Sequence, residues 1–473
     1  MAAQTQSQGF KLNYKRTLII GFAFFGILLL WQVYDTWCPT FLTELFKKAF
    51  GTDNEREVQY IVGIVMALDN LAALLIMPIF GRLSDKTHTK IGKRMPYILL
   101  GTFVCAVAFP FIPLFFHLNN LVGTIIMMGV ILLFAMMYRN PAVSLMPDIT
   151  PKPLRSKANG LINIMGYLGG AFATVVGMVF VLTNYLGKKG YDGPQIGSLW
   201  VIEMPFVIAS VLMVISAVVL FIFVKENKIA DEVKDEMARG ELEIEAVDKV
   251  EDDAPLTRAN RIMLFLILGA EFFWFMADNG VSTFLNNYII YNTDATSAAT
   301  AALTIVGGVG SILGFVFGGI IAGKIGRKWT LLSGLFLTLF SYAIWIILTF
   351  AVGLGSGPLI SDIPLWLYAI WLIKGFGMSL VHVNSYPMVV ELCTGKKIGQ
   401  FTGYYYASSM TAQTVTPIAF GALLLVESFD WHLLPIYACT CIAISSAIFL
   451  FVKNVKTRKT QIKVGLEALD QDD

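Results

Sequence analysis

The sequence predicts an all-α membrane protein in which twelve transmembrane helices form two pseudo-symmetric bundles of six. The 473-residue chain is 56% hydrophobic and 14% charged, with a mean hydropathy of +0.68. Soluble domains carry about 25% charged residues, so this chain lacks the polar surface to face water on all sides. Its apolar residues fall in long runs, and its one long charged stretch lies near the middle of the chain.

The apolar runs are long enough to cross a bilayer, which requires about 20 mostly apolar residues per helix. Six such runs come first, at residues 17–38, 60–83, 96–117, 121–147, 159–183 and 198–224. Six more follow, at residues 261–290, 297–322, 329–353, 364–391, 401–426 and 433–453. An even number of spans predicts that both termini lie on the same side.

The charged stretch divides the chain into matching halves. We predict an N-terminal six-helix bundle over residues 1–224, an acidic linker over 225–258, a C-terminal bundle over 259–455 and a tail over 456–473. We interpret the linker as a solvated, partly helical tether between the bundles. A regulatory docking segment is the alternative.

Lysine and arginine indicate the orientation, because cytoplasmic loops of membrane proteins carry an excess of them. One set of loops is rich in these residues: Lys86, Lys90, Lys93, Arg94, Lys152, Arg155, Lys157, Lys324, Arg327, Lys328, Lys396 and Lys397. The opposite loops carry few of them. We therefore expect a multi-pass protein of the plasma membrane with both termini and the linker in the cytoplasm.

Several functional classes lack support in the sequence. The five cysteines have no metal-site spacing, and no G-x-x-x-x-G-K-[ST] loop of an ATP-driven pump occurs. No Ser/His/Asp arrangement suggests an intramembrane enzyme. We expect no enzyme activity, metal, cofactor or nucleic-acid partner, and a monomeric chain in the lipid bilayer.

The two halves share a loop motif after their second spans. The first copy contains Gly81, Asp85, Lys86, Gly92, Lys93 and Arg94, and the second contains Gly326, Arg327 and Lys328. Glycines let helix ends approach, and basic residues meet carboxylates and helix C-termini. We expect these contacts to form across the seam between the halves and to act as a cytoplasmic gate.

The first copy, GRLSDKTHTKIGKRMPYI at residues 81–98, resembles the loop signature of the major facilitator superfamily. In detail it is similar to the loop of plant sucrose–proton symporters and of melibiose permeases, within the glycoside–pentoside–hexuronide cation symporters. The segments PAVSLMP at 141–147 and RSKANG at 155–160 resemble the exit of span four in the same group. The resemblance implies the major facilitator fold and sugar symport by alternating access.

The sequence departs from that group at its ion and sugar sites. Melibiose permeases bind sodium through paired aspartates in span two, whereas the matching segment here is ALLIMPIFG at 73–81. The sugar-binding aspartate of the group falls at Arg139, and a second aspartate of the sucrose symporters falls at Ser144. We therefore expect a proton rather than sodium as the coupling ion, carried by another carboxylate.

Ionisable residues far from the loops are the main functional signal, because each is expensive inside a bilayer. They are Asp35, Asp69, Arg139, Glu271, Asp278, Lys374 and His382. The resemblance implies that spans one, four, seven and ten line the cavity, and all these residues except Asp69 lie on those spans.

The proton-coupling candidates are Asp69, Glu271, Asp35 and Asp278. Asp69 and Glu271 fall near the midplane, whereas Asp35 and Asp278 fall nearer the outer end. We favour Asp69, with Arg139 or Lys374 as modulating cations. In the alternatives, Asp35 is a rim charge, Arg139 pairs with an acid only for packing, and Lys374 only neutralises Glu271 or Asp69.

Sugars are bound by hydrogen bonds together with aromatic rings against their apolar faces. The candidates for solute contact are Arg139, Asn140, Trp31, Gln32, Trp274, Asn279, Lys374, His382, Asn384, Tyr405 and Gln413. Packing of the aromatic residues is the alternative. We predict a disaccharide–proton or glycoside–proton symporter, with a proton-coupled exporter or facilitator of another small solute as the second hypothesis.

Glycines concentrate on spans five and eight, at Gly166, Gly169 and Gly170 and at Gly310, Gly314 and Gly318. Small residues at this spacing let helices pack closely. Spans five and eight meet at the seam between the halves in the resembled fold, so we expect these glycines to form a sliding surface there.

Overall fold

The computed structural model describes residues 11–151, 154–187, 196–240, 258–293, 295–351, 365–392, 398–426 and 428–453. Every regular element in these ranges is a helix. The first half contains α1 (Tyr14–Phe50), η1 (Glu55–Val58), α2 (Gln59–Asp85), α3 (Met95–Ala108), α4 (Phe111–His117), α5 (Leu121–Asp148), α6 (Arg155–Val179), α7 (Leu182–Leu186) and α8 (Leu199–Phe223). The short α9 (Glu226–Glu232) follows at the start of the linker.

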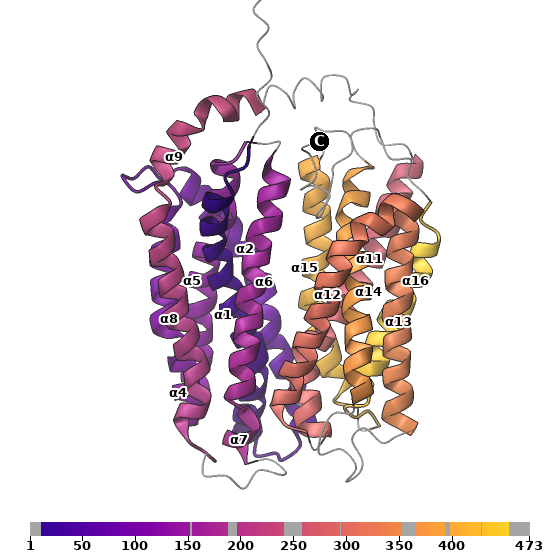
Figure 1. Cartoon of the computed structure of the whole chain (residues 1–473). Coiled ribbons are helices and arrows are strands. Elements are labelled where there is room, and N and C mark those ends of the chain that lie inside the picture. Colours follow the sequence, from indigo (N-terminus) through magenta and orange to yellow (C-terminus); the bar gives the residue numbers. More distant parts are fainter. Residues whose placement is uncertain are drawn as a thin grey trace, which may run out of the picture.

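The second half contains α11 (Arg258–Asn292), α12 (Ser297–Ile325), α13 (Arg327–Ala351), α14 (Leu365–Val390), α15 (Ile398–Leu423) and α16 (Leu433–Leu450). Because α3 with α4 and α6 with α7 each make one span, the helices form two bundles of six spans, which stand side by side in Figure 1. The predicted all-α membrane fold is confirmed. Linker residues 241–257 and the predicted tail, 456–473, lie outside the described residues.

Eleven of these spans are apolar enough to cross a membrane by length and composition. The remaining long helix, α15, carries tyrosine, serine, threonine and glutamine side chains along much of its length. Its polar character follows from its position, because α15 packs against α2 of the other half and contributes to the interior of the molecule.

Each bundle has its own hydrophobic core. In the first half, Phe41 stacks on Phe206, and Phe109 packs against the same ring. In the second half, Tyr288 and Trp345 make an edge-to-face contact inside a separate cluster. The two clusters touch at the end of α11, because Ile290 belongs to the first cluster and Tyr291 packs against both.

Helix α1 extends well beyond the predicted span. It continues to Phe50 rather than ending near residue 38, and Gly51 then closes it in the left-handed conformation (φ 66°). Residues 39–43 are fully or almost fully buried among other helices, so the chain has not left the bundle at that point. Asp35 consequently lies close to the middle of α1, and the alternative that it is a rim charge at the outer end is wrong.

The two halves meet along three pairs of spans: α1 with α11, α2 with α15, and α6 together with α7 against α12. The approach of α2 and α15 depends on glycine. A Cβ atom on Gly63 would lie 2.1 Å from the carbonyl oxygen of Pro417, and one on Gly421 would lie 2.5 Å from that of Gln59. No other residue allows backbones to come so close.

The glycines of α6 and α12 have a different role from the predicted one. A Cβ atom on Gly169 would lie 2.2 Å from the carbonyl oxygen of Phe25 on α1, and one on Gly310 would lie 2.1 Å from that of Leu372 on α14. These glycines therefore pack each helix into its own half. Helices α6 and α12 do contact each other, but the expectation that these residues form the sliding surface between the halves is wrong.

Candidate solute cavity and its polar surroundings

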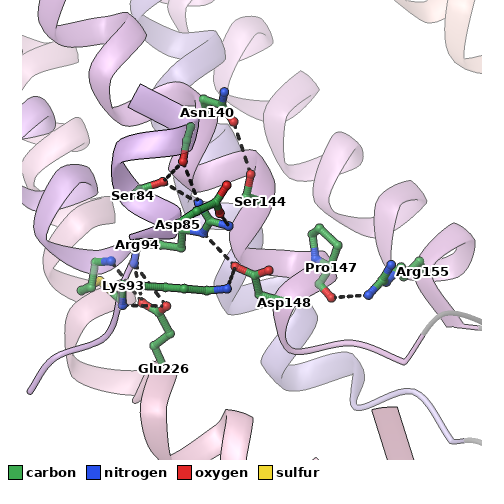
Figure 2. A network of polar contacts seen from close by, with 12 residues as sticks. Ser84, Asp85, Lys93, Arg94, Asn140, Ser144, Pro147, Asp148, Arg155 and Glu226 are labelled. Atoms are coloured by element: carbon green, nitrogen blue, oxygen red, sulfur yellow. Dashed lines mark hydrogen bonds and ion pairs between the residues drawn. The ribbon is translucent and has the colours of Figure 1, made fainter. Parts of the chain in front are cut away.

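We call the end of the bundles that carries residues 81–95 and 326–328 the basic end, and the other the opposite end. At the basic end, the Arg94 guanidinium organises the first loop motif (Figure 2). Its Nε donates to Asp148 at 2.8 Å, its Nη1 donates to Ser84 Oγ at 2.5 Å, and its Nη2 pairs with Asp85. The Lys93 ammonium lies 3.1 Å from the same Asp148 oxygen.

The start of the linker completes this network. The Glu226 carboxylate, on a residue that is only 3% exposed, accepts hydrogen bonds from the backbone N–H groups of Lys93 (2.9 Å), Arg94 (3.0 Å) and Met95 (3.1 Å) at the start of α3. A helix N-terminus leaves such N–H groups free and favours a negative charge. Gly92 has a φ of 119°, and a Cβ atom there would lie 2.1 Å from Glu226 Oε2. The described part of the linker is therefore docked at its start.

The second loop motif is also bonded within its own half. Arg327 Nη2 lies 3.2 Å from Glu391 Oε1, and Lys328 donates to the carbonyl of Leu450 at 3.4 Å. Gly326 closes α12 with a φ of 85°. Burial raises the pKa of Glu391, and Arg327 opposes that rise.

The prediction that the loop motifs bind across the seam is therefore wrong for this arrangement of the halves. The carboxylates that reach Arg94 and Arg327 all belong to the same half as the arginine that they contact. Gly81 serves a local purpose too, because the Asn140 amide packs against its Cα and a Cβ there would lie 2.7 Å from Asn140 Nδ2. Lys86 is exposed and contributes its backbone N–H to the end of α2.

Toward the opposite end, a buried polar seam joins the halves. Asn287 of α11 accepts from Thr40 Oγ1 at 2.7 Å and donates to Thr43 Oγ1 at 3.2 Å and to Gln59 Oε1 at 3.4 Å. The neighbouring Asn286 donates to Thr40 Oγ1 at 3.1 Å. We call these five residues the asparagine seam.

Three further bonds between the halves surround the asparagine seam. Tyr291 donates to Glu44 at 2.7 Å, Trp431 Nε1 donates to Glu55 at 3.0 Å, and Arg56 donates to the carbonyl of residue 429 at 2.5 Å. The sequence analysis missed this region because it ranked residues by charge. Two adjacent asparagines inside an apolar helix were the available signal.

A polar cavity of about 150 Å³ lies between the halves, between the asparagine seam and the basic end. Five residues predicted for solute or proton binding line it, and they come from four helices: Trp31, Asp35, Arg139, Asn279 and Gln413. The sequence analysis did not select Asn70, Ser282 and Thr283, which line it as well. The structure thus brings together one part of the predicted site.

The cavity combines a charged pair with free hydrogen-bonding atoms. The Arg139 guanidinium lies 6.0 Å from the centre of the Trp31 ring, within the range of a cation–π contact, and interacts electrostatically with Asp35. Trp31 Nε1 and Asn279 Oδ1 are buried and have no hydrogen-bond partner among the described residues. Both residues line the cavity, so a small side-chain rotation would bring these atoms to its surface.

A hydrogen bond across the seam closes one wall of the cavity. Asn70 Nδ2 of α2 lies 3.4 Å from the backbone oxygen of Gln413 on α15. Any movement of the halves at this level must change that contact, so the cavity wall is coupled to their arrangement.

Other predicted solute contacts lie outside the cavity. The Gln32 amide donates to Thr36 one turn further along its own helix, at 3.2 Å. The Asn140 amide donates to the carbonyl of Met77 at 2.7 Å and so ties α5 to α2. Both side chains are occupied by contacts within the N-terminal half.

Three predicted solute contacts of the C-terminal half also lie outside the cavity and are engaged within their own half. Asn384 donates to the carbonyl oxygen one turn earlier on α14, at 2.8 Å. Tyr405 shares a 2.9 Å hydrogen bond with Ser385. Trp274 is fully buried in the core of its bundle. No residue of α14 is among those that line the cavity, so the expectation from the resemblance that span ten contributes to it is not met in this structure.

The remaining charged residues separate into two environments. Lys374 Nζ lies 2.7 Å from Asp278 Oδ1, so the alternative that Lys374 neutralises Glu271 is wrong. Glu271 is 0% exposed, and neither carboxyl oxygen has a hydrogen-bond partner among the described residues. His382 packs its ring 5.3 Å from Phe275. Asp69 lies on α2, and its side chain is outside the described part of the structure.

Two matched six-span bundles around a polar cavity, with functional groups from both halves, define a polytopic solute carrier. The sequence bears this out, because it matches the Major Facilitator Superfamily over residues 22–352 and again over residues 267–469. The chain belongs to that superfamily and is a transporter rather than an enzyme. A search of curated protein sequences finds no significant match.

Solved structures share the fold over almost the whole chain. The POT family transporter PepTSo superposes with a TM-score of 0.65 at 13% identity, covering 93% of this chain and 98% of that one. The xylose transporter XylE from E. coli, in an inward open conformation, gives 0.62 at 15% identity, with 96% and 99% covered. A bacterial homolog to the human lysosomal transporter Spinster, inward-facing and occupied, gives 0.61 at 13%, with 94% and 97% covered.

Proposed function

We propose that this transporter is a secondary active sugar–proton symporter that moves a disaccharide or glycoside by alternating access. The observation that carries the proposal is the cavity between the halves. Its walls offer amide and hydroxyl groups from Asn70, Asn279, Ser282, Thr283 and Gln413. Such neutral donors and acceptors match the hydroxyl groups of a sugar.

The charges and the aromatic ring of the cavity favour the same class of solute. Arg139 and Asp35 balance each other, so the described lining carries no excess charge that would select an ionic solute. The Trp31 ring supplies a flat apolar surface of the kind that packs against the apolar face of a pyranose. Trp31 Nε1 and Asn279 Oδ1 are one donor and one acceptor on cavity-lining residues that have no partner within the described part of the chain.

The direction of opening follows from where the halves are bonded. The hydrogen bonds between described residues of the two halves lie in the asparagine seam, beyond it, or at the Asn70–Gln413 level. The loop networks at the basic end stay within each half. We infer a state in which the basic end opens, and we assign that end to the cytoplasm. Two solved structures with this fold are described as inward open or inward-facing.

The proton is the coupling ion in this proposal. Asp35, Asp69, Glu271 and Asp278 remain the candidate carriers. Asp35 shares the cavity with the solute-binding groups, Asp278 forms an ion pair with Lys374, and Glu271 is sealed from the surface.

Uptake into proteoliposomes tests the proposal. Purified protein is given a panel of radiolabelled disaccharides and glycosides under an imposed pH gradient, with and without a protonophore. We expect gradient-dependent accumulation and sugar-induced alkalinisation of the medium. Arg139→Gln, which removes the guanidinium over Trp31, should raise the KM by about tenfold, as for a lost charged hydrogen bond of about 1.5 kcal/mol. If uptake only equilibrates the sugar and does not respond to the pH gradient, the protein is a facilitator and not a symporter.

A second candidate function is the proton-coupled movement of another small solute. POT family peptide transporters are among the solved structures with this fold, and the Arg139–Asp35 pair offers opposite charges to the two ends of a zwitterion. Di- and tripeptides therefore belong in the same transport panel. Accumulation of peptides without any sugar uptake would select this alternative.

A further inference from the structure

The C-terminal half contains a second cluster of ionisable side chains apart from the cavity. Asp278 of α11 pairs with Lys374 of α14 at 2.7 Å. His382 of α14 and Tyr342 of α13 interact electrostatically with both members of that pair. None of these four residues lines the solute cavity. The cluster is therefore a separate feature that solute recognition does not explain.

The other half of the molecule also faces this cluster. Tyr167 of α6 interacts electrostatically with Asp278, and its ring lies 6.0 Å from that of Phe315 on α12. Since α6 and α12 form one of the three contacts between the halves, Tyr167 lies at the seam. A movement of the halves changes the surroundings of Asp278 even if the C-terminal bundle stays rigid.

The exposure of the pair is uneven. The side chain of Asp278 is 35% exposed, whereas that of Lys374 is 16% exposed. The carboxylate thus reaches the surface of the helices, while the ammonium stays held among them. Packing alone does not explain this ion pair, because apolar residues of similar size stabilise a protein interior at least as well. Charges at membrane depth usually mark ion pathways.

We propose that Asp278, Lys374 and His382 form the proton-binding site of the transport cycle, separate from the solute cavity. This inference rests on the proposed function, because it assigns the coupling proton of the symport reaction. It also assigns Lys374 and His382 to proton coupling rather than to the solute contacts that the sequence suggested.

The proton step is balanced at named atoms. A hydronium ion transfers its proton to a carboxylate oxygen of Asp278, so an O–H bond forms there and a water molecule is released. The ion pair with Lys374 is lost, Lys374 stays protonated, and the cluster gains one positive charge. When the halves exchange their contacts at Tyr167, the proton returns to water on the other side and the ion pair re-forms.

A charge-neutral double variant tests the assignment. Asp278→Asn combined with Lys374→Gln removes the titratable pair without leaving either charge alone in the membrane. At one proton per solute, a gradient of about one pH unit can drive about tenfold accumulation in the unmodified transporter. We expect the double variant to lose this accumulation and the alkalinisation signal, while sugar counterflow continues with unchanged affinity. The matched control is Arg327→Gln combined with Glu391→Gln, which removes an ion pair of the same half at the basic end and should keep accumulation.

The outcomes separate this inference from the proposed function. If the unmodified transporter shows no response to the pH gradient, the symport proposal itself fails. If it accumulates sugar and the double variant does so equally well, symport stands and the assigned proton site is wrong. Loss of counterflow affinity in a double variant that still folds, as judged by its thermal unfolding, would make the cluster a solute site and also overturn the assignment.

Discussion

The asparagine seam yields the sharpest prediction about the arrangement of the halves. Asn287 is fully buried and makes three hydrogen bonds, to Thr40, Thr43 and Gln59, all of which belong to the other half. Asn287→Ala removes all three and adds no steric conflict. We expect the variant to retain its fold, because each bundle has its own core, but to weaken the closed state at the opposite end.

The size of the effect follows from those three bonds. Hydrogen bonds between membrane helices contribute about 0.6 kcal/mol each on average, and three of them give about 2 kcal/mol. A difference of that size changes the equilibrium between two arrangements by about thirtyfold. If the unmodified protein is mostly closed at the opposite end, the variant should therefore contain a measurable population that is open there.

Distances between spin labels can measure this shift. Labels at Lys48 and Leu425, which are exposed and lie at the opposite end in different halves, are introduced in a background without native cysteines. We expect Asn287→Ala to add a longer distance to the distribution. Asn384→Ala is the control, because Asn384 is also buried but bonds only to its own helix. A single unchanged distance in Asn287→Ala, or an equal change in the control, would refute the reasoning.

Two further predictions concern the helix contacts. Glu226→Gln weakens three hydrogen bonds to the start of α3 and should lower the free energy of unfolding by about 1–3 kcal/mol, as judged by thermal unfolding. The control is Glu232→Gln on the exposed side of α9, which should change the free energy of unfolding little. Equal Tm values for the two variants would count against the docked linker. Gly63→Ala forces a Cβ atom against the carbonyl of Pro417 and should reduce the yield of folded, monodisperse protein, whereas Gly129→Ala, with open space around it, should not. Equal yields would contradict the close approach of α2 and α15.

The sequence predicts the architecture well, because the length of each apolar run can be counted directly from the residues. Twelve runs were expected and twelve spans are present, including α15, which is too polar to stand out by hydropathy. The ends of the spans are less predictable. Residues 39–46 of α1 continue as helix because the neighbouring helices bury them, and a residue-by-residue hydropathy reading has no access to that packing.

Pairing of buried charges is harder to predict, because it depends on how each helix is rotated. Lys374 was assigned to Glu271 or Asp69 by depth, yet it contacts Asp278, seven residues away from Glu271 on the same helix. The two acids differ in their neighbours, since Glu271 interacts electrostatically with Tyr405 of α15. Depth is set by sequence position, whereas partnership is set by tertiary packing.

Only part of the candidate site can be predicted from the sequence, because the rest also depends on tertiary packing. Trp31, Asp35 and Arg139 stand out because charged and aromatic residues are conspicuous in apolar runs, and they do share a cavity. Asn70 and Ser282 were missed, although they line the same cavity, because neutral polar residues are common in membrane helices. Only the juxtaposition of α2, α11 and α15 distinguishes them from the rest.

The near-complete separation of the two cores has an energetic consequence for the transport cycle. Among the described residues, Ile290 and Tyr291 of α11 are those of the C-terminal half that pack against the N-terminal cluster, so the free energy of switching resides in these two side chains and in a small set of hydrogen bonds and close backbone contacts. Moving an equilibrium between two such arrangements from 1:99 to 99:1 requires about 5.5 kcal/mol. Ion gradients and bound solutes can supply energies of that order, and a molecule built this way can alternate many times without unfolding any part of itself.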